Sequence, residues 1–241
     1  MLKIENKPLF INQMFTRIAK KYDFLNNIMT FNLHQIWKKQ AIESASVNIP
    51  YLKHAKVLDL CTGTGDMAQM WAKKPQVSKV MAIDSCPPML EEAEKRQRKI
   101  KEPWATKITF MPGDALELPF PDDNFDAISV GFGLRNVADL RRAIQEIFRV
   151  LKPGGFIVSL DLGHPEQPFI QNIYKNIFLN FIPLLGSIFA GDKLAYRYLV
   201  DSLETWPKQK ELSQMFWDHG FTRSYFKDLM FGTIALVVAQ K

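Results

Sequence analysis

The spacing of apolar residues divides this chain into parts with different patterns. From Phe10 to Asn48, apolar positions recur at helical spacing, with an interruption near Thr30–Leu33 and no good strand pattern. The next hundred or so positions alternate between short apolar runs and amphipathic stretches. Pro168–Trp217 is again helical in pattern, and two strand-like runs around Phe231–Gly232 end the chain.

The apolar runs in the middle of the chain predict buried strands at Ala55–Leu60, Lys79–Ile83, Lys107–Met111, Phe125–Val130 and Gly155–Leu160. Helices are predicted between them at Asp66–Lys73, Pro87–Lys99 and Val137–Val150. Strands separated by helices are typical of parallel β-α-β units, so we expect an α/β fold with a doubly wound, mostly parallel sheet. Thr222–Asp228 and Thr233–Gln240 predict a terminal β-hairpin, which brings the expected sheet to seven strands.

The length of 241 residues and an apolar fraction of 47% suit a single domain. We expect four parts: a helical cap at 1–50, a core at 51–165, a helical insertion at 166–218 and the hairpin at 219–241. Apolar residues in the insertion form one helical face, which either packs on the core or acts as a lid over an apolar substrate. The members of this face are Ile170, Ile173, Tyr174, Ile177, Phe178 and Phe181.

Composition limits which cellular compartment and which binding partners are expected for the protein. The 31 basic and 25 acidic residues give a net charge of +6, scattered along the chain, which favours a transient contact with an anionic membrane surface over nucleic acid. Cys61 and Cys86 lack metal-ligand spacing and indicate a reducing cytoplasm and no metal site. Charges in Met1–Lys7 argue against a signal peptide, and polar residues interrupt Phe169–Ala190, so no spanning helix is expected.

The sharpest chemical signal is the segment that follows the first predicted strand. Gly63 and Gly65 stand where a ligand binds in a doubly wound sheet, because glycines allow close approach of the backbone. With Ala68 they also match the G-x-G-x-x-A pattern of dinucleotide-binding sites. Asp59, four residues before the first glycine, would repel a pyrophosphate and favours a ligand that carries an ammonium group.

Carboxylates also end the next two predicted strands. Asp84 can accept hydrogen bonds from both hydroxyls of a ribose, or it can cap the helix that follows. Asp114, with Ala115 beside it, lies where an adenine amino group would bind, or it is a turn aspartate. Together with Asp59 and the two glycines, these strand ends resemble the S-adenosylmethionine site of the class I methyltransferases, whose antiparallel seventh strand the terminal hairpin also resembles.

A closer resemblance comes from outside this core. Residues Tyr22–Trp37 are similar to the N-terminal signature of the ubiquinone/menaquinone biosynthesis C-methyltransferase family. Further motifs of that family are GFGLRNV at 131–137, RVLKPGG at 149–155 and YRYLVDS at 196–202. The resemblance extends from about Phe15 to Lys241 and so covers nearly the whole chain.

The resemblance implies an enzyme that transfers the methyl group of S-adenosylmethionine to a ring carbon of a prenylated quinol. Thr64, Asp84 and the Asp114–Ala115 pair are similar to the family's cofactor contacts. Two departures stand out: Gly131 replaces a serine found in some members, and Asp161 and Gly163 replace a frequent Glu-x-Ser. Asp161 is similar to the naphthoquinol-methylating branches, which favours demethylmenaquinol as the substrate over the benzoquinol of the ubiquinone pathway.

Ring methylation requires alignment of the ring carbon and loss of its proton through a base or a water relay. His34 titrates in the right range and is one candidate, although it can equally be structural. Arg135 can stabilise a quinolate or orient a water, and Asn136 beside it can bind substrate. Tyr22, Tyr196 and Tyr198 carry hydroxyls that can bind quinol oxygens or pack in the core.

Three alternatives stay open on sequence grounds. The first is a class I methyltransferase that acts on another small apolar acceptor. The second is an NAD-dependent oxidoreductase, from the glycine pattern, against which Asp59 argues. The third is a non-enzymatic adaptor that keeps the fold, for which the intact Asp84 and glycines give little support. The sequence carries no signal for the oligomeric state or for the length of the prenyl tail. The membrane contact is expected at the inner membrane.

Overall fold

A computed structural model describes residues 7–46, 54–177 and 193–241 of the chain. Its centre is a seven-stranded sheet with the order β3-β2-β1-β4-β5-β7-β6. The strands are β1 (Ala55–Leu60), β2 (Val77–Asp84), β3 (Ile108–Pro112), β4 (Phe125–Gly131), β5 (Leu151–Leu162), β6 (Arg223–Leu229) and β7 (Ile234–Gln240). Strands β1 to β5 run parallel, and β7 runs antiparallel to both neighbours, as the sequence predicts.

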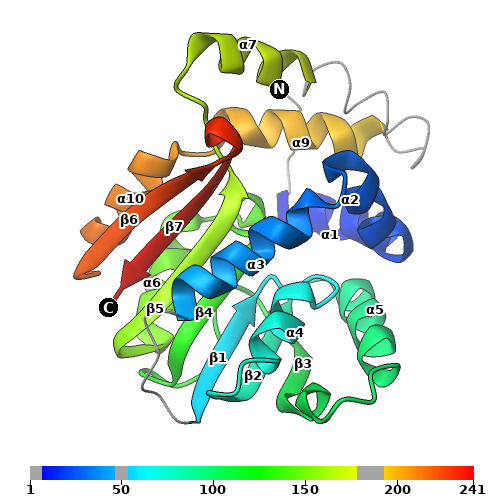
Figure 1. Cartoon of the computed structure of the whole chain (residues 1–241), viewed down its shortest axis with the longest axis vertical. Coiled ribbons are helices and arrows are strands. Elements are labelled where there is room, and N and C mark those ends of the chain that lie inside the picture. The colour runs from blue at the N-terminus through cyan, green and yellow to red at the C-terminus, as the bar shows by residue number, and fades with distance from the viewer. Residues whose placement is uncertain (1–6, 47–53, 178–192) are drawn as a thin grey trace.

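Helices cover both faces of this sheet (Figure 1). One face packs against α3 (Leu33–Ser46) and α4 (Asp66–Ala72), through Ala41, Trp71 and their neighbours. The other face packs against α6 (Leu140–Val150) and α10 (Gln209–Asp218). Burial on both faces explains why the central strands are nearly continuous apolar runs.

The N-terminal part consists of α1 (Lys7–Ile18), η1 (Ala19–Lys21), α2 (Tyr22–Thr30) and α3. The predicted interruption near Thr30–Leu33 is a sharp turn in which Phe31 and Asn32 have φ angles of 48° and 63°. Left-handed backbone of this kind ends a helix. The turn reverses the chain and places α2 beyond the carboxyl ends of the central strands (Figure 1).

The insertion contains α7 (Pro168–Asn176) and α9 (Lys193–Thr205), which lie above the sheet in Figure 1, and it leads into α10. On the predicted apolar face, Tyr174 is buried, whereas Ile173 and Ile177 are exposed. Phe178 and Phe181 lie outside the described residues. No helix among those that the structure describes has the length and apolar character needed to cross a membrane.

The predicted elements are present, with two informative differences. Helix α6 starts at Leu140 and not at Val137, because Asp139 caps it by accepting the backbone N–H of Arg142 at 3.0 Å. The strand predicted at Gly155–Leu160 begins earlier, at Leu151, and contains an irregularity where β4 advances two residues and β5 advances five. The Pro153–Gly155 segment forms this irregularity.

Candidate active site

The loop after β1 is held in an unusual conformation by its neighbours. Cys61, Gly63 and Gly65 all have positive φ angles, of 55°, 56° and 84°. Glycine adopts such angles without steric cost, which explains the two glycines of the motif. At Gly65 a Cβ atom would also lie 2.9 Å from the ring of Phe110, so a larger residue would not fit there without a shift.

Asp84 fixes this loop to the end of β2. Its Oδ2 accepts the backbone N–H of Gly63 at 2.8 Å, and its Oδ1 accepts that of Cys86 at 2.9 Å. Burial raises the pKa of Asp84, and the backbone hydrogen bonds oppose that shift. Each carboxylate oxygen has a second lone pair, so Asp84 can still accept two hydrogen bonds from a ligand.

A cavity of about 170 Å³ opens beside this carboxylate, at the carboxyl ends of the strands. Four of the residues expected to contact a cofactor line it: Gly63, Asp84, Asp114 and Ala115. Helix α1 contributes the opposite wall, and Asn12 on that helix donates a hydrogen bond to the backbone oxygen of Ser85 at 2.7 Å. The cap therefore covers the predicted cofactor site, a relationship that strand and helix periodicity could not reveal.

Asp59 lies behind the loop and lines neither of the two described cavities. It is 1% exposed, and its oxygens accept hydrogen bonds from Thr62 at 2.5 Å and from Ser129 at 2.6 Å. Burial raises its pKa to about 6 despite these hydrogen bonds. The structure thus places Asp59 where it supports the loop, and direct contact with an ammonium group stays a prediction.

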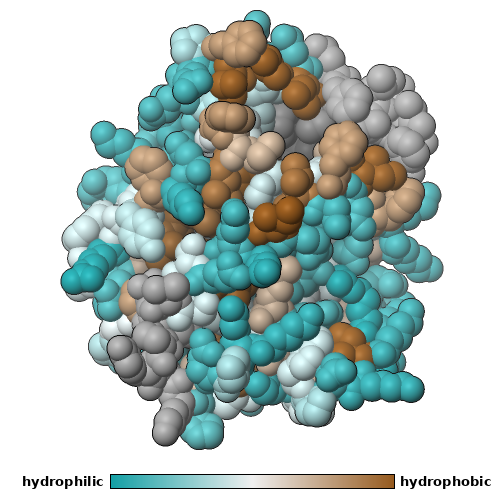
Figure 2. All heavy atoms as spheres, in the orientation of Figure 1, coloured by the Kyte–Doolittle hydropathy of each residue, from teal (hydrophilic) through white to brown (hydrophobic). Residues whose placement is uncertain are grey.

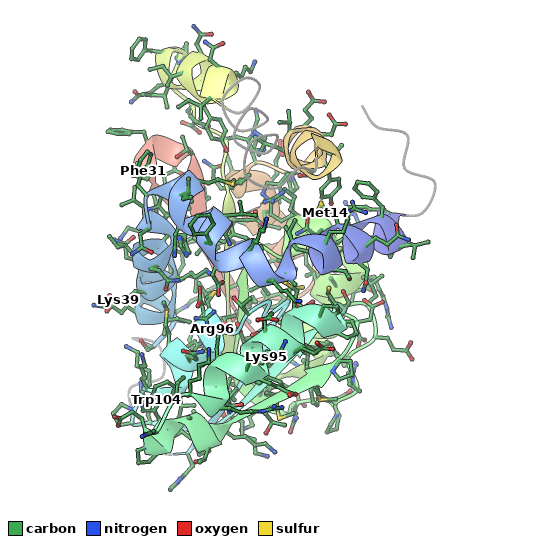
Figure 3. All side chains as sticks on the ribbon, turned by 90° about the vertical axis from the view of Figure 1, so that its right-hand side faces the viewer. Met14, Phe31, Lys39, Lys95, Arg96 and Trp104 are labelled. Atoms are coloured by element: carbon green, nitrogen blue, oxygen red, sulfur yellow. The ribbon has the colours of Figure 1, made fainter. Side chains whose placement is uncertain are left out.

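Thr64 is likewise occupied within the protein. Its hydroxyl donates to Asp23 of α2 at 2.6 Å, and its backbone oxygen accepts from Arg96 of α5 (Pro87–Arg98) at 3.0 Å. Arg96 also donates to Asp23 at 2.9 Å and to Asp66 at 2.6 Å. Figure 3 shows Arg96 between α5 and the N-terminal helices. The glycine loop is therefore tied to the cap through charged side chains.

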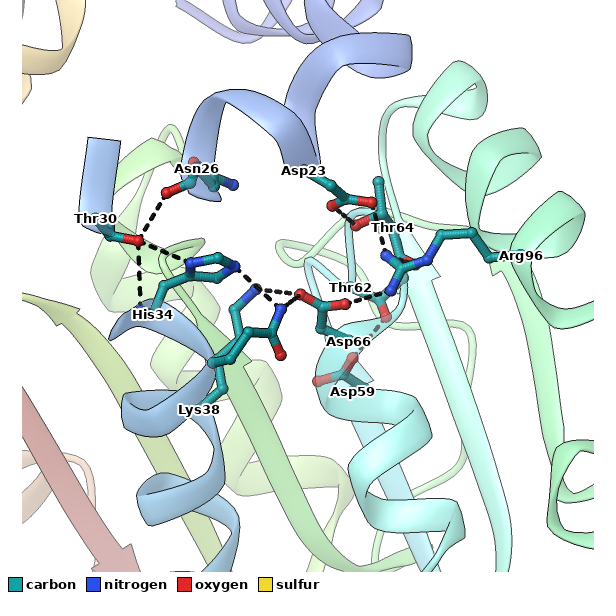
Figure 4. A network of polar contacts seen from close by, with 11 residues as sticks. Asp23, Asn26, Thr30, His34, Lys38, Asp59, Thr62, Thr64, Asp66 and Arg96 are labelled. Atoms are coloured by element: carbon teal, nitrogen blue, oxygen red, sulfur yellow. Dashed lines mark hydrogen bonds and ion pairs between the residues drawn. The ribbon is translucent and has the colours of Figure 1, made fainter. Parts of the chain in front are cut away.

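Asp66, at the start of α4, is the centre of this network (Figure 4). Besides Arg96, it accepts hydrogen bonds from Lys38 at 2.8 Å and from Gln35 at 2.7 Å, both on α3. Burial alone would raise the pKa of Asp66, but Lys38 and Arg96 outweigh burial and hold it well below its ordinary value. Asp66, Lys38 and Arg96 were not among the predicted site residues.

His34 belongs to the same network, and its hydrogen bonds define its tautomer. Thr30 Oγ1 donates to the backbone oxygen of Asn26 at 2.7 Å, so its hydroxyl proton is used there. His34 Nδ1, 2.8 Å from that hydroxyl, must then donate to it. His34 Nε2 accepts from the Gln35 amide at 3.0 Å, and burial, followed by Lys38, lowers the pKa of the ring.

A second, much larger cavity of about 1060 Å³ lies between the cap and the insertion. Most of its lining is apolar, and Figure 2 shows hydrophobic side chains gathered in the upper half of the face seen there, below α7 and around α2 and α3. Four residues line both this cavity and the smaller one: Phe15, Tyr22, Phe132 and Asn136. The two cavities therefore adjoin.

Polar groups in the large cavity come from two sides. His34, Lys38 and Tyr22 face it from the cap. Arg135 and Asn136, in the turn η3 (Leu134–Asn136) after β4, face it from the sheet, and Tyr198 of α9 donates to Asn136 Oδ1 at 3.1 Å. Burial raises the pKa of Tyr198 to about 12, so its hydroxyl stays protonated.

The structure thus brings most predicted substrate residues to one cavity. Tyr22, His34, Arg135, Asn136 and Tyr198 all line it. Tyr196 lies on α9, and its side chain is outside the described part of the chain.

Arg135 is held by residues that the sequence did not single out as functional. Its guanidinium forms an ion pair with Asp161 of β5 and donates from Nε to Ser202 of α9 at 3.0 Å. The only sequence signals were that Asp161 departs from the pattern of relatives and that Ser202 lies in a family motif.

The small cavity fits an adenosine-containing sulfonium better than a pyrophosphate. Its carboxylates, Asp84 and Asp114, are hydrogen-bond acceptors and would repel phosphate oxygens. Two glycines leave the backbone exposed in the walls of this cavity. Gly63 has a positive φ angle, and at Gly113 a Cβ would lie 3.3 Å from Ile83. These residues are suited to hydroxyl and amino groups of a nucleoside.

The fold and this site together define a class of protein. A solved S-adenosylmethionine-dependent methyltransferase from Thermotoga maritima shares the fold, with a TM-score of 0.63 and 18% identity over 95% of this chain and 99% of that chain. The fold is that of the class I methyltransferases.

The chain belongs to the ubiE/COQ5 methyltransferase family, whose model matches residues 1–241. It is 39% identical to a demethylmenaquinone methyltransferase of Leptospira interrogans, over 98% of this chain and 94% of that protein. It is 35% identical to a ubiquinone/menaquinone biosynthesis C-methyltransferase, UbiE, of Rickettsia bellii, over 100% of this chain and 96% of that protein. The family expected from the sequence motifs is confirmed.

Proposed function

We propose that this protein is an S-adenosylmethionine-dependent C-methyltransferase that methylates a ring carbon of a prenylated quinol, with demethylmenaquinol as the preferred acceptor. The observation that carries the proposal is the junction of the two cavities. A small site with nucleoside-binding carboxylates adjoins a large apolar one at Phe15, Tyr22, Phe132 and Asn136. Family membership supports a methyltransferase over an NAD-dependent oxidoreductase or an adaptor.

The cofactor would supply an electrophilic methyl group. In this proposal Asp84 accepts the ribose hydroxyls, Asp114 and Ala115 border the adenine, and Gly63, Thr64 and Gly65 shape the loop, with Asp59 as its buried support. The apolar residues at the junction exclude water from the reacting carbon and hold the acceptor ring in place. Positioning of this kind is the larger part of catalysis for an already reactive donor.

Proton removal falls to groups of the large cavity. Arg135 stabilises negative charge on a ring oxygen, and Asn136, Tyr22 and Tyr198 are the candidate partners of the two ring oxygens. Tyr196 is a further candidate from the sequence alone. His34 is the candidate base, because its lowered pKa keeps the ring neutral at physiological pH. For His34 to take up a proton at Nε2, the Gln35 amide must turn away from it.

The cap and the insertion act as covers in this proposal: α1 closes the cofactor site, and α7 and α9 form the lid over the prenyl tail. Five exposed residues at the opening of the large cavity form an apolar rim: Phe31, Ile173, Ile177, Met230 and Phe231. Each buried CH₂ of a tail contributes about 0.8 kcal/mol, so a long tail stays in a bilayer unless the cavity opens onto it. Transient contact of the apolar rim with an anionic membrane surface follows, helped by the net charge of +6.

The test is methyl transfer from labelled S-adenosylmethionine to reduced prenylated naphthoquinol or benzoquinol, in detergent and under reductant, with products identified by mass spectrometry. We expect label on the naphthoquinol ring carbon. Label on benzoquinol alone would move the enzyme to the ubiquinone pathway. If neither ring is labelled while the cofactor binds, the acceptor is another small apolar molecule and the quinol proposal is wrong.

A further inference from the structure

A buried ion pair between Arg135 and Asp161 lies at the boundary of the large cavity. The two side chains are only 6% and 4% exposed. Arg135 lines the cavity, whereas Asp161 does not. Asp161 therefore touches the arginine but not the space that an acceptor occupies, and any effect it has on the reaction passes through Arg135.

The hydrogen bonds of the Arg135 guanidinium leave one end of it available. Nη1 is paired with Asp161, and Nε donates to Ser202 Oγ at 3.0 Å. Within residues 7–46, 54–177 and 193–241, Nη2 has no hydrogen-bond partner. Arg135 lines the large cavity, so this end can donate to an acceptor that enters the cavity.

The two partners of the guanidinium are themselves fixed. Asp161 Oδ1 accepts the backbone N–H of Leu162 at 2.8 Å, which holds the carboxylate against β5. Ser202 is four residues after Tyr198 on α9, so the two share one face of that helix. Tyr198 donates a hydrogen bond to Asn136, and Ser202 accepts one from Arg135. One helix of the insertion thus positions two consecutive residues of η3.

We propose that Asp161 and Ser202 are positioning residues that direct Arg135 Nη2 into the large cavity, where it donates to a ring oxygen of the acceptor. This inference rests on the proposed function. Because Asp161 already compensates the charge of Arg135, a neutral hydroxyl oxygen binds there better than a carboxylate or phosphate, which would add a second anion beside Asp161. Loss of the hydroxyl proton leaves negative charge on that oxygen, and the fixed N–H stabilises it before the ring carbon attacks the methyl group of the donor.

The test compares methyl transfer by the wild type with that of Asp161→Asn, Ser202→Ala and Arg135→Gln. We expect Asp161→Asn to lower kcat by about 10- to 100-fold, Ser202→Ala by less, and neither to change the Kd of S-adenosylmethionine. In the double variant Asp161→Asn/Arg135→Gln, the Asp161 change should cause no further loss of kcat, because its effect passes through Arg135. Losses that multiply in the double variant would overturn the inference.

Asp126→Asn is the matched control. Asp126 is also a buried strand carboxylate in an ion pair, with Lys152 at 2.7 Å, but it lies at the start of β4 and lines neither cavity. It should lower thermal stability and leave kcat unchanged. If Asp126→Asn lowers kcat as much as Asp161→Asn does, the effect is general destabilisation and the inference fails.

A second measurement does not depend on turnover. In ¹⁵N spectra the Arg135 Nε–Hε signal, identified by its loss in Arg135→Gln, should be protected from exchange in the wild type and exposed in Ser202→Ala. An unprotected wild-type signal would overturn the positioning role even if Asp161→Asn does not fold. Failure of the proposed function is distinct, because it would appear as a wild type that labels neither ring.

Discussion

Asp84 and Gly63 are joined by a hydrogen bond of 2.8 Å from the glycine amide to the carboxylate, and this bond connects the end of β2 to the loop after β1. The same carboxylate group accepts a second amide, from Cys86, through its other oxygen. Two amides thus fix its orientation and leave one lone pair on each oxygen, and Asp84 lines the small cavity. A fixed, two-oxygen acceptor of this kind suits the two adjacent hydroxyls of a ribose.

Asp84→Ala should therefore weaken binding of S-adenosylmethionine by more than tenfold, or about 1.4 kcal/mol, as measured by titration calorimetry. Both the ligand hydrogen bonds and the support of the Gly63 amide are lost. Asp218→Ala, at an exposed position at the end of α10, is the control and should leave affinity unchanged. An Asp84→Ala protein that binds the cofactor normally would show that the cofactor lies elsewhere.

The sequence predicted the parts of this site that depend on strand ends. Asp84 and Asp114 follow apolar runs, and parallel strands bring their carboxyl ends to one edge. The position of Asp59 was predictable, but not that its side chain would turn inward to Ser129. The loop path that decides this depends on three positive φ angles, which have no periodic signature.

Contacts between distant helices were beyond the sequence for a different reason. Asp66 collects partners from α3 and α5, and Ser202 reaches Arg135 from 67 positions away. Helical periodicity gives the face on which a residue lies but not the neighbour that this face meets. The proximity of Arg135 and Asp161 could be expected from the order of the strands. Strands β4 and β5 are adjacent, and the two residues lie near the carboxyl ends of these strands.

Asp66→Asn should lower the free energy of unfolding at pH 7 by about 3–5 kcal/mol, because it leaves Lys38 buried without its counter-charge. The pKa of Asp66 is lowered in the folded state, so its contribution is present above about pH 4 and is lost as the pH falls. Urea unfolding of both proteins between pH 7 and pH 3 measures this difference. The gap between them should narrow in acid.

Glu43→Gln provides the comparison, since Glu43 pairs with Lys39 on the surface of α3 at 3.8 Å. An exposed pair contributes less than about 1 kcal/mol. Equal losses in the two variants, or a gap between Asp66→Asn and the wild type that does not depend on pH, would contradict the role assigned to Asp66.

His34 should be neutral at pH 7 with its proton on Nδ1, because the Thr30 hydroxyl accepts from Nδ1 and Gln35 donates to Nε2. Its pKa lies below the ordinary 6.5, so protonation is resisted in the folded state, and the stability it contributes is lost as the pH falls below about 6.5. Ring ¹⁵N shifts over a titration report both the tautomer and the pKa. A ring protonated on Nε2 at pH 7 would rule out His34 as the base.

Phe31 and Phe231 should act together in membrane contact. They are 82% and 75% exposed, and both adopt left-handed backbone, with φ angles of 48° and 58°. Such conformations cost energy in residues with bulky side chains, so they persist where the surrounding structure holds them. Figure 3 shows Phe31 on the outer side of the molecule, where it lies in the turn between α2 and α3. Aromatic side chains presented in this way are typical of residues at a membrane interface.

The variant Phe31→Ser/Phe231→Ser should bind vesicles at least tenfold more weakly than the wild type in co-sedimentation, since each buried phenyl contributes about 1.5–3 kcal/mol. Vesicles with anionic lipid should bind both proteins better than neutral ones, because the chain carries a charge of +6. Phe226→Ser, a partly exposed position on β6 that lines neither cavity, is the control and should bind as the wild type does. If the double variant sediments with vesicles as fully as the control, the acceptor reaches the large cavity by a route that does not involve the apolar rim.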